Sequence, residues 1–409
     1  MILKIKGNKI WFCAVSLLVI VGIVTTIIRI VSPAEIPNTT PSNNISSANI
    51  TTVSTVTIEN MRGVWVPYMS LDTGKYTEDS FKTNFKNIIE TAKNNKMNTL
   101  IVHIRPFSDA LYQSEIFPNS HVVAGTQGVE VEFDALEYMV KTAHENDLYF
   151  HAWINPYRIS TADTPVTLAD NSIVNKLEEN DIIEYDGGKY INPSSDNGKR
   201  LIIEGVKEVA QNYDVDGIQF DDYFYPTSNT EIDREYYEEY LENLDSECIE
   251  LTQFEWRRAN VNMLISNVYN CIKTINSDLI FGISPQCNIN NCNEIGADVE
   301  LWCNSYGYVD YICPQIYVNF EHSTTPFDKN LKEWLEITKN NKVTLCVGLA
   351  LYKANSDYDD GTWKNSNDIL KKQIELCKEN GIDNYMIYDI DYFNDENTSE
   401  EVENVMSVL

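Results

Sequence analysis

The chain has 409 residues, 43% of them hydrophobic and 11% aromatic, which is enough apolar material for a large core and excludes a disordered or collagen-like chain. The formal net charge is -30 at pH 7. An acidic surface of this kind repels phosphate polyanions, so we expect no nucleic-acid partner and favour a neutral or cationic ligand.

The N-terminus carries a candidate membrane span. Residues 10–28 form a 19-residue stretch without a charged side chain, and Lys4, Lys6 and Lys9 precede it. This length matches a hydrocarbon core of about 30 Å, and the lysines predict a cytoplasmic N-terminus with the rest of the chain outside. We therefore predict a membrane anchor or signal segment over residues 1–31. A cleaved signal peptide, giving a secreted protein, is the alternative; the length of the run and the lack of a small-residue cleavage site favour the uncleaved single-pass anchor.

The next segment has the composition of a linker. Residues 32–60 are rich in Ser, Thr, Asn and Pro, and Glu35 and Glu59 are the only charged residues among them. A flexible coil of this length spans roughly 30 Å, so the domain that follows, residues 61–409, is expected to lie close to the outer face of the cell membrane.

Eight short apolar runs follow in chain order, at residues 63–67, 99–104, 148–154, 217–221, 279–284, 309–313, 343–349 and 383–388. Runs that are apolar nearly throughout are typical of parallel strands buried on both faces. Amphipathic helical stripes lie between several of them, for example over residues 81–92, 134–143, 201–209 and 261–272. Asp134 is predicted to cap the second of these helices. The pattern predicts a (β/α)8 TIM-type barrel with long loops. An open doubly wound sheet is the alternative, but no Gly-rich phosphate loop follows the first run.

In a barrel of this type the chemistry lies at the carboxyl ends of the strands. The fourth run ends in Asp221-Asp222-Tyr223, two adjacent carboxylates beside aromatic side chains. We therefore predict Asp221 and Asp222 as the catalytic pair, whereas Asp216 and Asp310, which open their strands, are expected to be structural.

Other polar and aromatic side chains follow the strand ends and are predicted to bind substrate. They are His103, Arg105, Asp109, Asn155, Tyr157, Arg158, Tyr223, Gln315, Tyr317, Tyr352 and Asp389. Hydroxyl-binding amides and flat aromatic faces at a barrel mouth suit a sugar. His103 and Arg105 are two residues apart, so we expect them to share a strand face and Arg105 to orient a catalytic carboxylate.

The sequence lacks the residue patterns that metal-dependent hydrolysis or a Ser-His-Asp triad would need. The chain has five histidines, with no metal-ligand spacing and no recognisable Ser-His-Asp set, so we expect no metal and no cofactor. The cysteines are expected to be mostly buried thiols; a disulfide is plausible only among Cys287, Cys292 and Cys303. Carboxylates without a metal favour glycoside hydrolysis.

The same motifs resemble the glycosyl-hydrolase-like family ten of bacterial cell-envelope proteins. The similar segments, in order, are residues 61–65, 105–112, 153–158, 216–226, 256–258, 282–285 and 310–317. The resemblance implies a (β/α)8 barrel that hydrolyses glycan strands, with Asp221 and Asp222 as the acidic pair of the family motif. Val318, Gln219 and residues 286–292 depart from the family pattern, which leaves the choice of substrate less defined than the reaction.

Together these features predict a membrane-tethered extracellular glycoside hydrolase that cleaves the glycan of peptidoglycan or a related wall polysaccharide. The alternative is a wall-glycan-binding barrel that has lost catalysis. Since residues 348–352 at the end of the seventh run include no carboxylate, we favour a mechanism in which the 2-acetamido group of the substrate is the nucleophile. The retaining, inverting and substrate-assisted routes all stay open at this stage.

Overall fold

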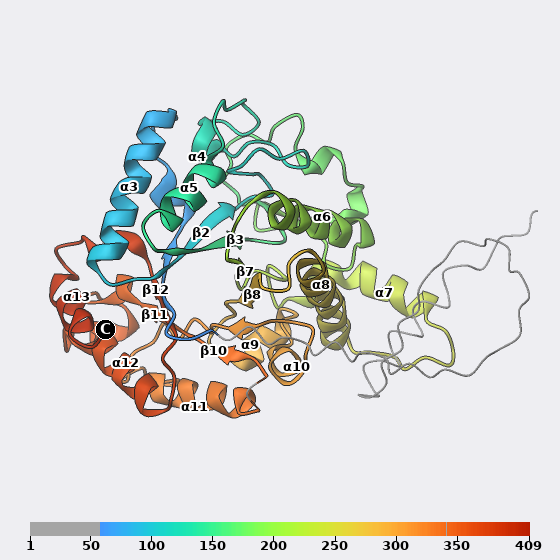
Figure 1. Ribbon diagram of the computed structural model, residues 1–409. Coiled ribbons are helices and arrows are strands. Elements are labelled where there is room, and N and C mark those ends of the chain that lie inside the picture. The colour runs from blue at the N-terminus through green and yellow to red at the C-terminus, as the bar shows by residue number, and fades with distance from the viewer. Residues whose placement is uncertain (1–57, 341) are drawn as a thin grey trace, which may run out of the picture. The chain divides into compact units, whose positions relative to one another are not determined.

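The computed structural model describes residues 58–340 and 342–409, and its centre is a sheet of parallel strands surrounded by helices (Figure 1). The hydrogen-bonded order is β10-β9-β8-β7-β3-β2-β1-β12-β11. The strand bounds are β1 (Arg62–Val66), β2 (Thr99–Arg105), β3 (Tyr149–Ile154), β7 (Gly217–Phe220), β8 (Ile280–Ile283), β9 (Tyr311–Ile312), β10 (Thr344–Leu345), β11 (Val347–Ala350) and β12 (Tyr385–Tyr388).

The two ends of this order belong to one stretch of chain. Only Cys346 separates β10 from β11, and its backbone N–H donates to the carbonyl of Ile312 at 2.9 Å. Gly348 then donates to the carbonyl of Pro314 at 2.9 Å. The sheet therefore closes into a barrel, and each of the eight predicted runs contains a barrel strand, with β10 and β11 both in the seventh. The predicted barrel is confirmed.

Helices follow the strands and cover the outside of the barrel (Figure 1). Their bounds are α2 (Tyr68–Leu71), α3 (Glu78–Asn94), α4 (His121–Ala124), α5 (Ala135–His144), α6 (Asp196–Asn212), α8 (Gln253–Ile275), α9 (Ile289–Glu294), α10 (Val299–Asn304), α11 (Phe327–Thr338), α12 (Ile369–Glu379) and α13 (Ser399–Met406). Single 3-10 turns are η1 (Ile173–Asn175), η2 (Glu179–Asp181), η3 (Thr230–Asp233), η4 (Leu351–Lys353), η5 (Asp359–Lys364) and η6 (Ile390–Phe393).

Side chains at the helix starts explain why the longer helices begin where they do. The Asp134 carboxylate accepts from the backbone N–H of Glu137 at 3.0 Å, as its predicted capping role requires. Thr252 and Glu255 form a capping box at the start of α8. Each contact satisfies backbone donors that have no partner within the helix.

A small antiparallel sheet lies between β3 and α6 in the chain. It consists of β4 (Arg158–Ser160), β5 (Ile182–Tyr185) and β6 (Gly188–Ile191) in the order β4-β6-β5. Asp186 and Gly187 join β5 to β6 with φ values of 49° and 74°. Asp-Gly is the sequence preferred for a two-residue hairpin turn of this kind, because glycine adopts positive φ at little cost.

The start of the folded domain can be placed from burial. Ile58 is buried, and it packs in one apolar cluster with Met61, Trp65 and Cys313. The folded domain therefore includes residues from Ile58 on, three residues before its predicted start at Met61. The predicted span over residues 10–28 lies outside the described residues. Among the helices of residues 58–340 and 342–409, none has the length and apolar character needed to cross a bilayer.

The two carboxylates at strand starts have structural contacts. Asp216 accepts from the backbone N–H of Phe150 at 2.7 Å and contacts His144 at 2.9 Å. Asp310 accepts from the N–H of Phe281 at 2.7 Å and pairs with Lys273 at 2.8 Å. Each joins neighbouring elements at the amino-terminal end of the barrel, in agreement with their predicted structural role.

The structure decides whether the three loop cysteines form a disulfide. Cys287, Cys292 and Cys303 are free thiols, so no disulfide forms among them. Burial raises the pKa of the Cys287 and Cys303 thiols to about 12. These cysteines are inert packing groups, because the reactive thiolate form is suppressed.

Residues 235–251 belong to a second compact unit, which carries most of helix α7 (Arg234–Asn243). Within it, the Tyr237 hydroxyl donates to the carbonyl of Leu251 at 2.6 Å, and the N–H of Leu251 donates to the Tyr240 hydroxyl at 3.3 Å. These contacts hold the segment after α7 against its own helix.

Candidate active site

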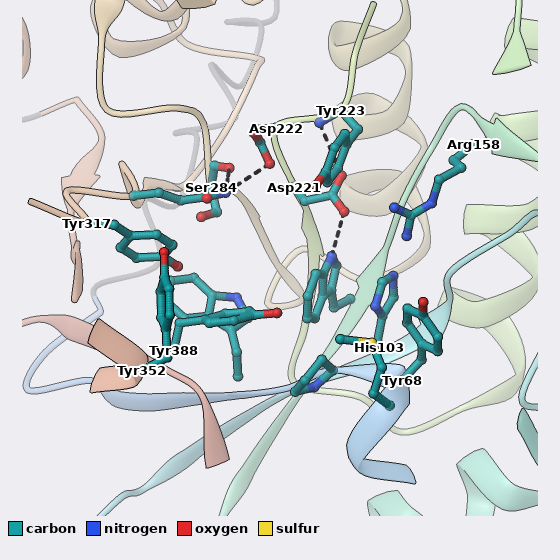
Figure 2. Close-up of a pocket in the computed structure, with 15 residues that line it drawn as sticks. Tyr68, His103, Arg158, Asp221, Asp222, Tyr223, Ser284, Tyr317, Tyr352 and Tyr388 are labelled. Carbon is teal, nitrogen blue, oxygen red and sulfur yellow. Dashed lines mark hydrogen bonds between the residues drawn. The ribbon is translucent and has the colours of Figure 1, made fainter. Parts of the chain in front are cut away.

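A pocket of about 330 Å³ opens at the carboxyl ends of the barrel strands (Figure 2). Its lining comes from nearly every strand end: Trp65, Pro67, Tyr68, Met69, His103, Trp153, Arg158, Asp221, Asp222, Tyr223, Ser284, Gln315, Tyr317, Tyr352 and Tyr388. The pocket thus has one acidic pair, one arginine, and walls made mostly of aromatic rings.

Asp221 is the first residue after β7 and is almost completely buried. Two side-chain donors converge on its Oδ2 atom: Trp153 Nε1 at 3.0 Å and Asn155 Nδ2 at 3.2 Å. Among residues 58–340 and 342–409, its Oδ1 atom accepts a hydrogen bond only from the backbone N–H of Tyr223, at a long 3.4 Å. This asymmetry leaves Oδ1 as the oxygen able to carry a proton while Oδ2 accepts.

Asp222 points away from Asp221, toward the strand ends of β8 and β9 (Figure 2). Its Oδ1 atom accepts from Gln315 Nε2 at 3.0 Å, and the same amide donates to the Ser284 carbonyl at 3.1 Å. The strand ends at Phe220, directly before the pair, so the two adjacent carboxylates can line one pocket from different sides.

The two carboxyls differ in acidity. Burial, and then the negative charge of Asp222, raises the pKa of Asp221 to about 7. Burial also raises the pKa of Asp222, but the hydrogen bond from Gln315 opposes that shift. On raising the pH, the first proton therefore leaves Asp222 and the second leaves Asp221. With its pKa raised to about 7, Asp221 keeps its proton to higher pH than an ordinary aspartic acid, which is what a proton donor needs.

Arg158 is the cation that faces the pair. It follows β3, and its Nε atom donates to the Pro106 carbonyl at 3.0 Å. Its guanidinium lies 4.6 Å from the ring centroid of Phe107 and 5.1 Å from that of Tyr223. Its positive charge lowers the pKa of both Asp221 and Asp222 and so partly offsets their burial.

Arg105, which we expected in this role, lies elsewhere. The pairing of β2 with β3 shifts between His103 and Arg105, so the strand has a local irregularity at this point. The simple two-residue alternation therefore fails, and the two side chains do not share a face. The Arg105 guanidinium lies 4.5 Å from the Phe117 ring centroid, and a Cβ atom on Gly205 of α6 would come within 2.1 Å of its Nη1. Arg105 is thus packed between the barrel and α6, outside the pocket lining.

His103 does line the pocket. Its imidazole stacks on Trp153 with ring centroids 3.8 Å apart and planes 8° from parallel. Both ring nitrogens are buried without a hydrogen-bond partner among the described residues. Burial and the nearby charge of Arg158 hold the pKa of His103 well below its usual value, so the ring is neutral at pH 7. A neutral imidazole can both donate to and accept from a ligand hydroxyl.

Besides Arg105, four predicted substrate-binding residues do not line the pocket. Asn155 stands behind Asp221 and positions it, and Tyr157 is buried against Phe224. Asp109 accepts from Gln127 Nε2 at 3.2 Å and faces His121. Asp389 accepts from the N–H of Asp391 and so caps η6. The remaining predicted residues, Arg158, Tyr223, Gln315, Tyr317 and Tyr352, line the pocket together with His103 and the acidic pair.

One aromatic wall was only partly anticipated. Trp65 contacts Tyr317 and Tyr388, with ring centroids 6.4 and 6.1 Å away, and Tyr317 and Tyr388 are 5.9 Å apart. Figure 2 shows Tyr317, Tyr352 and Tyr388 together on one side of the pocket, opposite His103 and Arg158. Tyr388 is the aromatic residue that ends the eighth predicted run, a signal that could have added it to the predicted site, whereas Trp65 lies in the middle of the first run.

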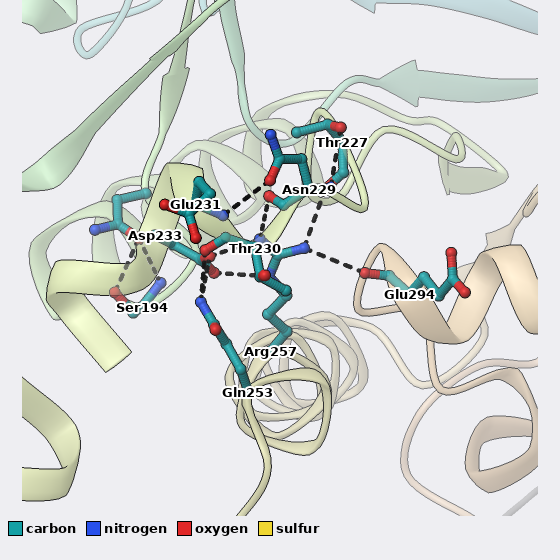
Figure 3. Close-up of polar contacts among 10 residues, drawn as sticks. Ser194, Thr227, Asn229, Thr230, Glu231, Asp233, Gln253, Arg257 and Glu294 are labelled. Atoms are coloured by element: carbon teal, nitrogen blue, oxygen red, sulfur yellow. Dashed lines mark hydrogen bonds and ion pairs between the residues drawn. The ribbon is translucent and has the colours of Figure 1, made fainter. Parts of the chain in front are cut away.

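A buried ion pair fixes the segment that follows the acidic pair (Figure 3). Arg257 of α8 makes two contacts with the Asp233 carboxylate, at 2.7 Å through Nε and 2.6 Å through Nη2, and both side chains are fully buried. Arg257 also donates to the carbonyls of Thr227 and Asn229 at 3.1 and 2.9 Å. One guanidinium therefore holds the loop after Asp222 at several points.

A parallel barrel with two carboxyls and aromatic walls at the carboxyl ends of its strands is an arrangement typical of glycoside hydrolases. Comparison with known proteins agrees: the glycosyl hydrolase-like 10 family model matches residues 60–365, so the chain belongs to that family. The family resemblance predicted from the motifs is confirmed.

Two named bacterial proteins are similar in sequence to this chain. Glycosyl hydrolase YngK of Bacillus subtilis is 30% identical over 73% of this chain, which spans 62% of YngK. Glycosyl hydrolase DigH of Escherichia coli K12 is 31% identical over 76% of each chain.

Two solved structures share the fold. One is the PgaB (BpsB) glycoside hydrolase domain from Bordetella bronchiseptica, with TM-score 0.55, 14% identity, and 86% of this chain and 100% of that chain covered. The other is the catalytic domain of a beta-amylase from Paenibacillus polymyxa, with TM-score 0.55, 10% identity, and 85% and 98% covered.

Proposed function

We propose that this protein hydrolyses glycan strands of peptidoglycan or a related wall polysaccharide, with Asp221 as the proton donor and Asp222 as its anionic partner. The observation that carries the proposal is the arrangement around Asp221: two donors occupy Oδ2, the pKa is raised to about 7, and Oδ1 is left to hold the proton.

In the proposed reaction Asp221 protonates the oxygen of the leaving sugar while positive charge develops at the anomeric carbon. Asp222, held by Gln315, is the anion that stabilises this charge or orients a 2-acetamido group that attacks it. The second route is favoured because residues 348–352, at the end of β11, include no carboxylate, and Asp389 after β12 is a helix cap. Water then attacks the anomeric carbon and displaces the 2-acetamido oxygen where that group has added. The ionised Asp221 accepts the proton of this water, so the hydroxyl goes to the sugar and the acid is regenerated.

The aromatic walls support a sugar as the bound group. Trp65, Tyr317 and Tyr388 offer ring faces for the C–H surface of a pyranose, and His103 offers two unpaired ring nitrogens for its hydroxyls. The alternative function, a barrel that only binds wall glycan, needs these walls but not a raised pKa on Asp221.

Incubation of the full-length protein with purified sacculi separates the two functions. We expect new reducing ends with the wild-type protein and none above background with Asp221→Asn, whereas both should bind the sacculi. Binding by the wild-type protein without new reducing ends would support the non-catalytic alternative.

The pH dependence offers a check on the two roles. The wild-type rate should fall as the pH rises through about 7, because Asp221 then loses the proton that it must donate. The negative charge of Asp222 helps to raise that pKa, so Asp222→Asn should move the alkaline limb of the residual rate to lower pH. An unchanged alkaline limb in this variant would contradict the assignment of Asp221 as the acid.

We further propose that residues 1–31 tether the enzyme to the cell membrane with the barrel outside. The charge-free stretch after three lysines supports this topology. Protease added to intact cells should therefore digest the barrel, while a cytoplasmic marker protein stays intact. Full protection of the barrel in intact cells, with digestion after lysis, would contradict the outward orientation.

A further inference from the structure

A second group of tyrosines lies at the rim of the pocket. Tyr352 contacts Tyr358 and Tyr392, with ring centroids 5.5 and 6.1 Å away. Tyr358 is 52% exposed, whereas Tyr352 and Tyr392 are partly buried. We call Tyr352, Tyr358 and Tyr392 the outer platform. Aromatic rings with this much exposed apolar surface are not needed to fill the core.

The outer platform is continuous with the pocket wall. Tyr352 belongs to both, because it lines the pocket and its ring lies 6.0 Å from that of Tyr317 and 5.9 Å from that of Tyr388. A row of neighbouring rings therefore runs from the wall beside the acidic pair, through Tyr352, to the exposed Tyr358. A ligand that fills the pocket and extends along this row would contact an aromatic ring at each step.

The platform is held in place by its own contacts. Lys353 Nζ donates to the Tyr317 carbonyl at 2.8 Å and lies 5.2 Å from the Tyr358 ring centroid. The Asp389 carboxylate caps η6, the turn that carries Tyr392. A binding surface whose rings are fixed beforehand loses little conformational entropy when it meets a ligand.

The size of the pocket points to what occupies the platform. Its 330 Å³ is near the lower end of the roughly 300–1,000 Å³ range of small-molecule sites, so it holds only a few sugar units. A longer glycan must leave the pocket, and the platform offers the next aromatic surface. Its rings suit sugar rings, which pack on aromatic faces through their C–H groups.

We propose that the outer platform is a binding subsite for further sugar units of the glycan chain whose bond is cut in the pocket. This inference rests on the proposed function and narrows the substrate class: the enzyme acts on polymeric chains that occupy both pocket and platform, in preference to short oligosaccharides confined to the pocket.

The test compares long and short substrates with platform variants. The probes are peptide-free glycan strands from peptidoglycan, separated by length, and the variants are Tyr358→Ala and Tyr392→Ala in the full-length protein. Losing one stacking contact should raise KM for the long strands roughly two- to tenfold and leave kcat within about twofold. KM for the shortest strand that is still cleaved should not change. Tyr358→Trp, which keeps a flat ring, should restore the wild-type KM.

Tyr306→Ala is the matched control, because Tyr306 is 59% exposed but precedes β9, at the opposite end of the strands. It should leave both KM values unchanged. Equal effects of the platform variants on long and short strands, or no effect on either, would overturn the subsite. Binding of the same strands is measured in parallel. If the wild-type protein cut no strand, the proposed function would fail, and a length-dependent loss of binding in Tyr358→Ala would still support the platform.

Discussion

Asp221→Asn is expected to lower the rate of glycan hydrolysis by about a hundredfold or more, because asparagine cannot donate the proton that the leaving oxygen needs. The variant should fold, since the asparagine carbonyl can still accept from Trp153 and Asn155 in place of Oδ2. Reducing-end release from sacculi gives the rate, and circular dichroism gives the fold. Asp222→Asn should cause a loss of similar order, through the missing negative charge beside the reacting centre.

Asp389→Asn is the control for this pair. Burial raises the pKa of Asp389 to about 7 as well, so the shifted pKa alone does not distinguish it from Asp221. Asp389 differs from Asp221 because it accepts a hydrogen bond from the N–H of Asp391 and lies outside the pocket lining. Its substitution should therefore cost less activity than either pair variant. Near wild-type turnover in both pair variants, or a larger loss in Asp389→Asn, would move the catalytic centre away from the end of β7.

Arg257→Ala is expected to destabilise the barrel by ~3–5 kcal/mol, because it leaves the buried Asp233 carboxylate without its partner. The loop at Thr227 and Asn229 also loses the donors that hold it after the acidic pair. Urea unfolding of the variant should show the lower free energy of unfolding, and its activity should fall even where it remains folded.

Arg258→Ala is the matched control on the same helix. Arg258 follows Arg257 directly but is partly exposed, so its removal uncovers no buried charge. We expect a change within about 0.5 kcal/mol, as for an ordinary surface substitution. Equal free energies of unfolding for the two variants would contradict the role assigned to the Arg257–Asp233 pair.

Much of this protein follows from its sequence alone. The eight apolar runs predicted the barrel strands, because parallel strands buried on both faces must be apolar nearly throughout. The rule that barrel chemistry lies at strand ends placed Asp221, Asp222, Gln315 and Tyr317 at the pocket that the structure contains. Asp134 was predicted as a helix cap from local sequence, since capping depends on residues only three apart.

Other features depend on contacts between residues far apart in the chain, which local periodicity does not encode. The alternation that paired His103 with Arg105 breaks at one irregularity in β2, so Arg158 faces the carboxylates instead. The pKa of Asp221 depends on burial and on Trp153, 68 positions away in sequence. The contact between Tyr352 and Tyr388 likewise exists only because the parallel pairing of β11 with β12 brings the end of β12 beside the turn after β11. Strand periodicity specifies which residues reach the barrel mouth, whereas strand registers and side-chain packing decide which of them meet.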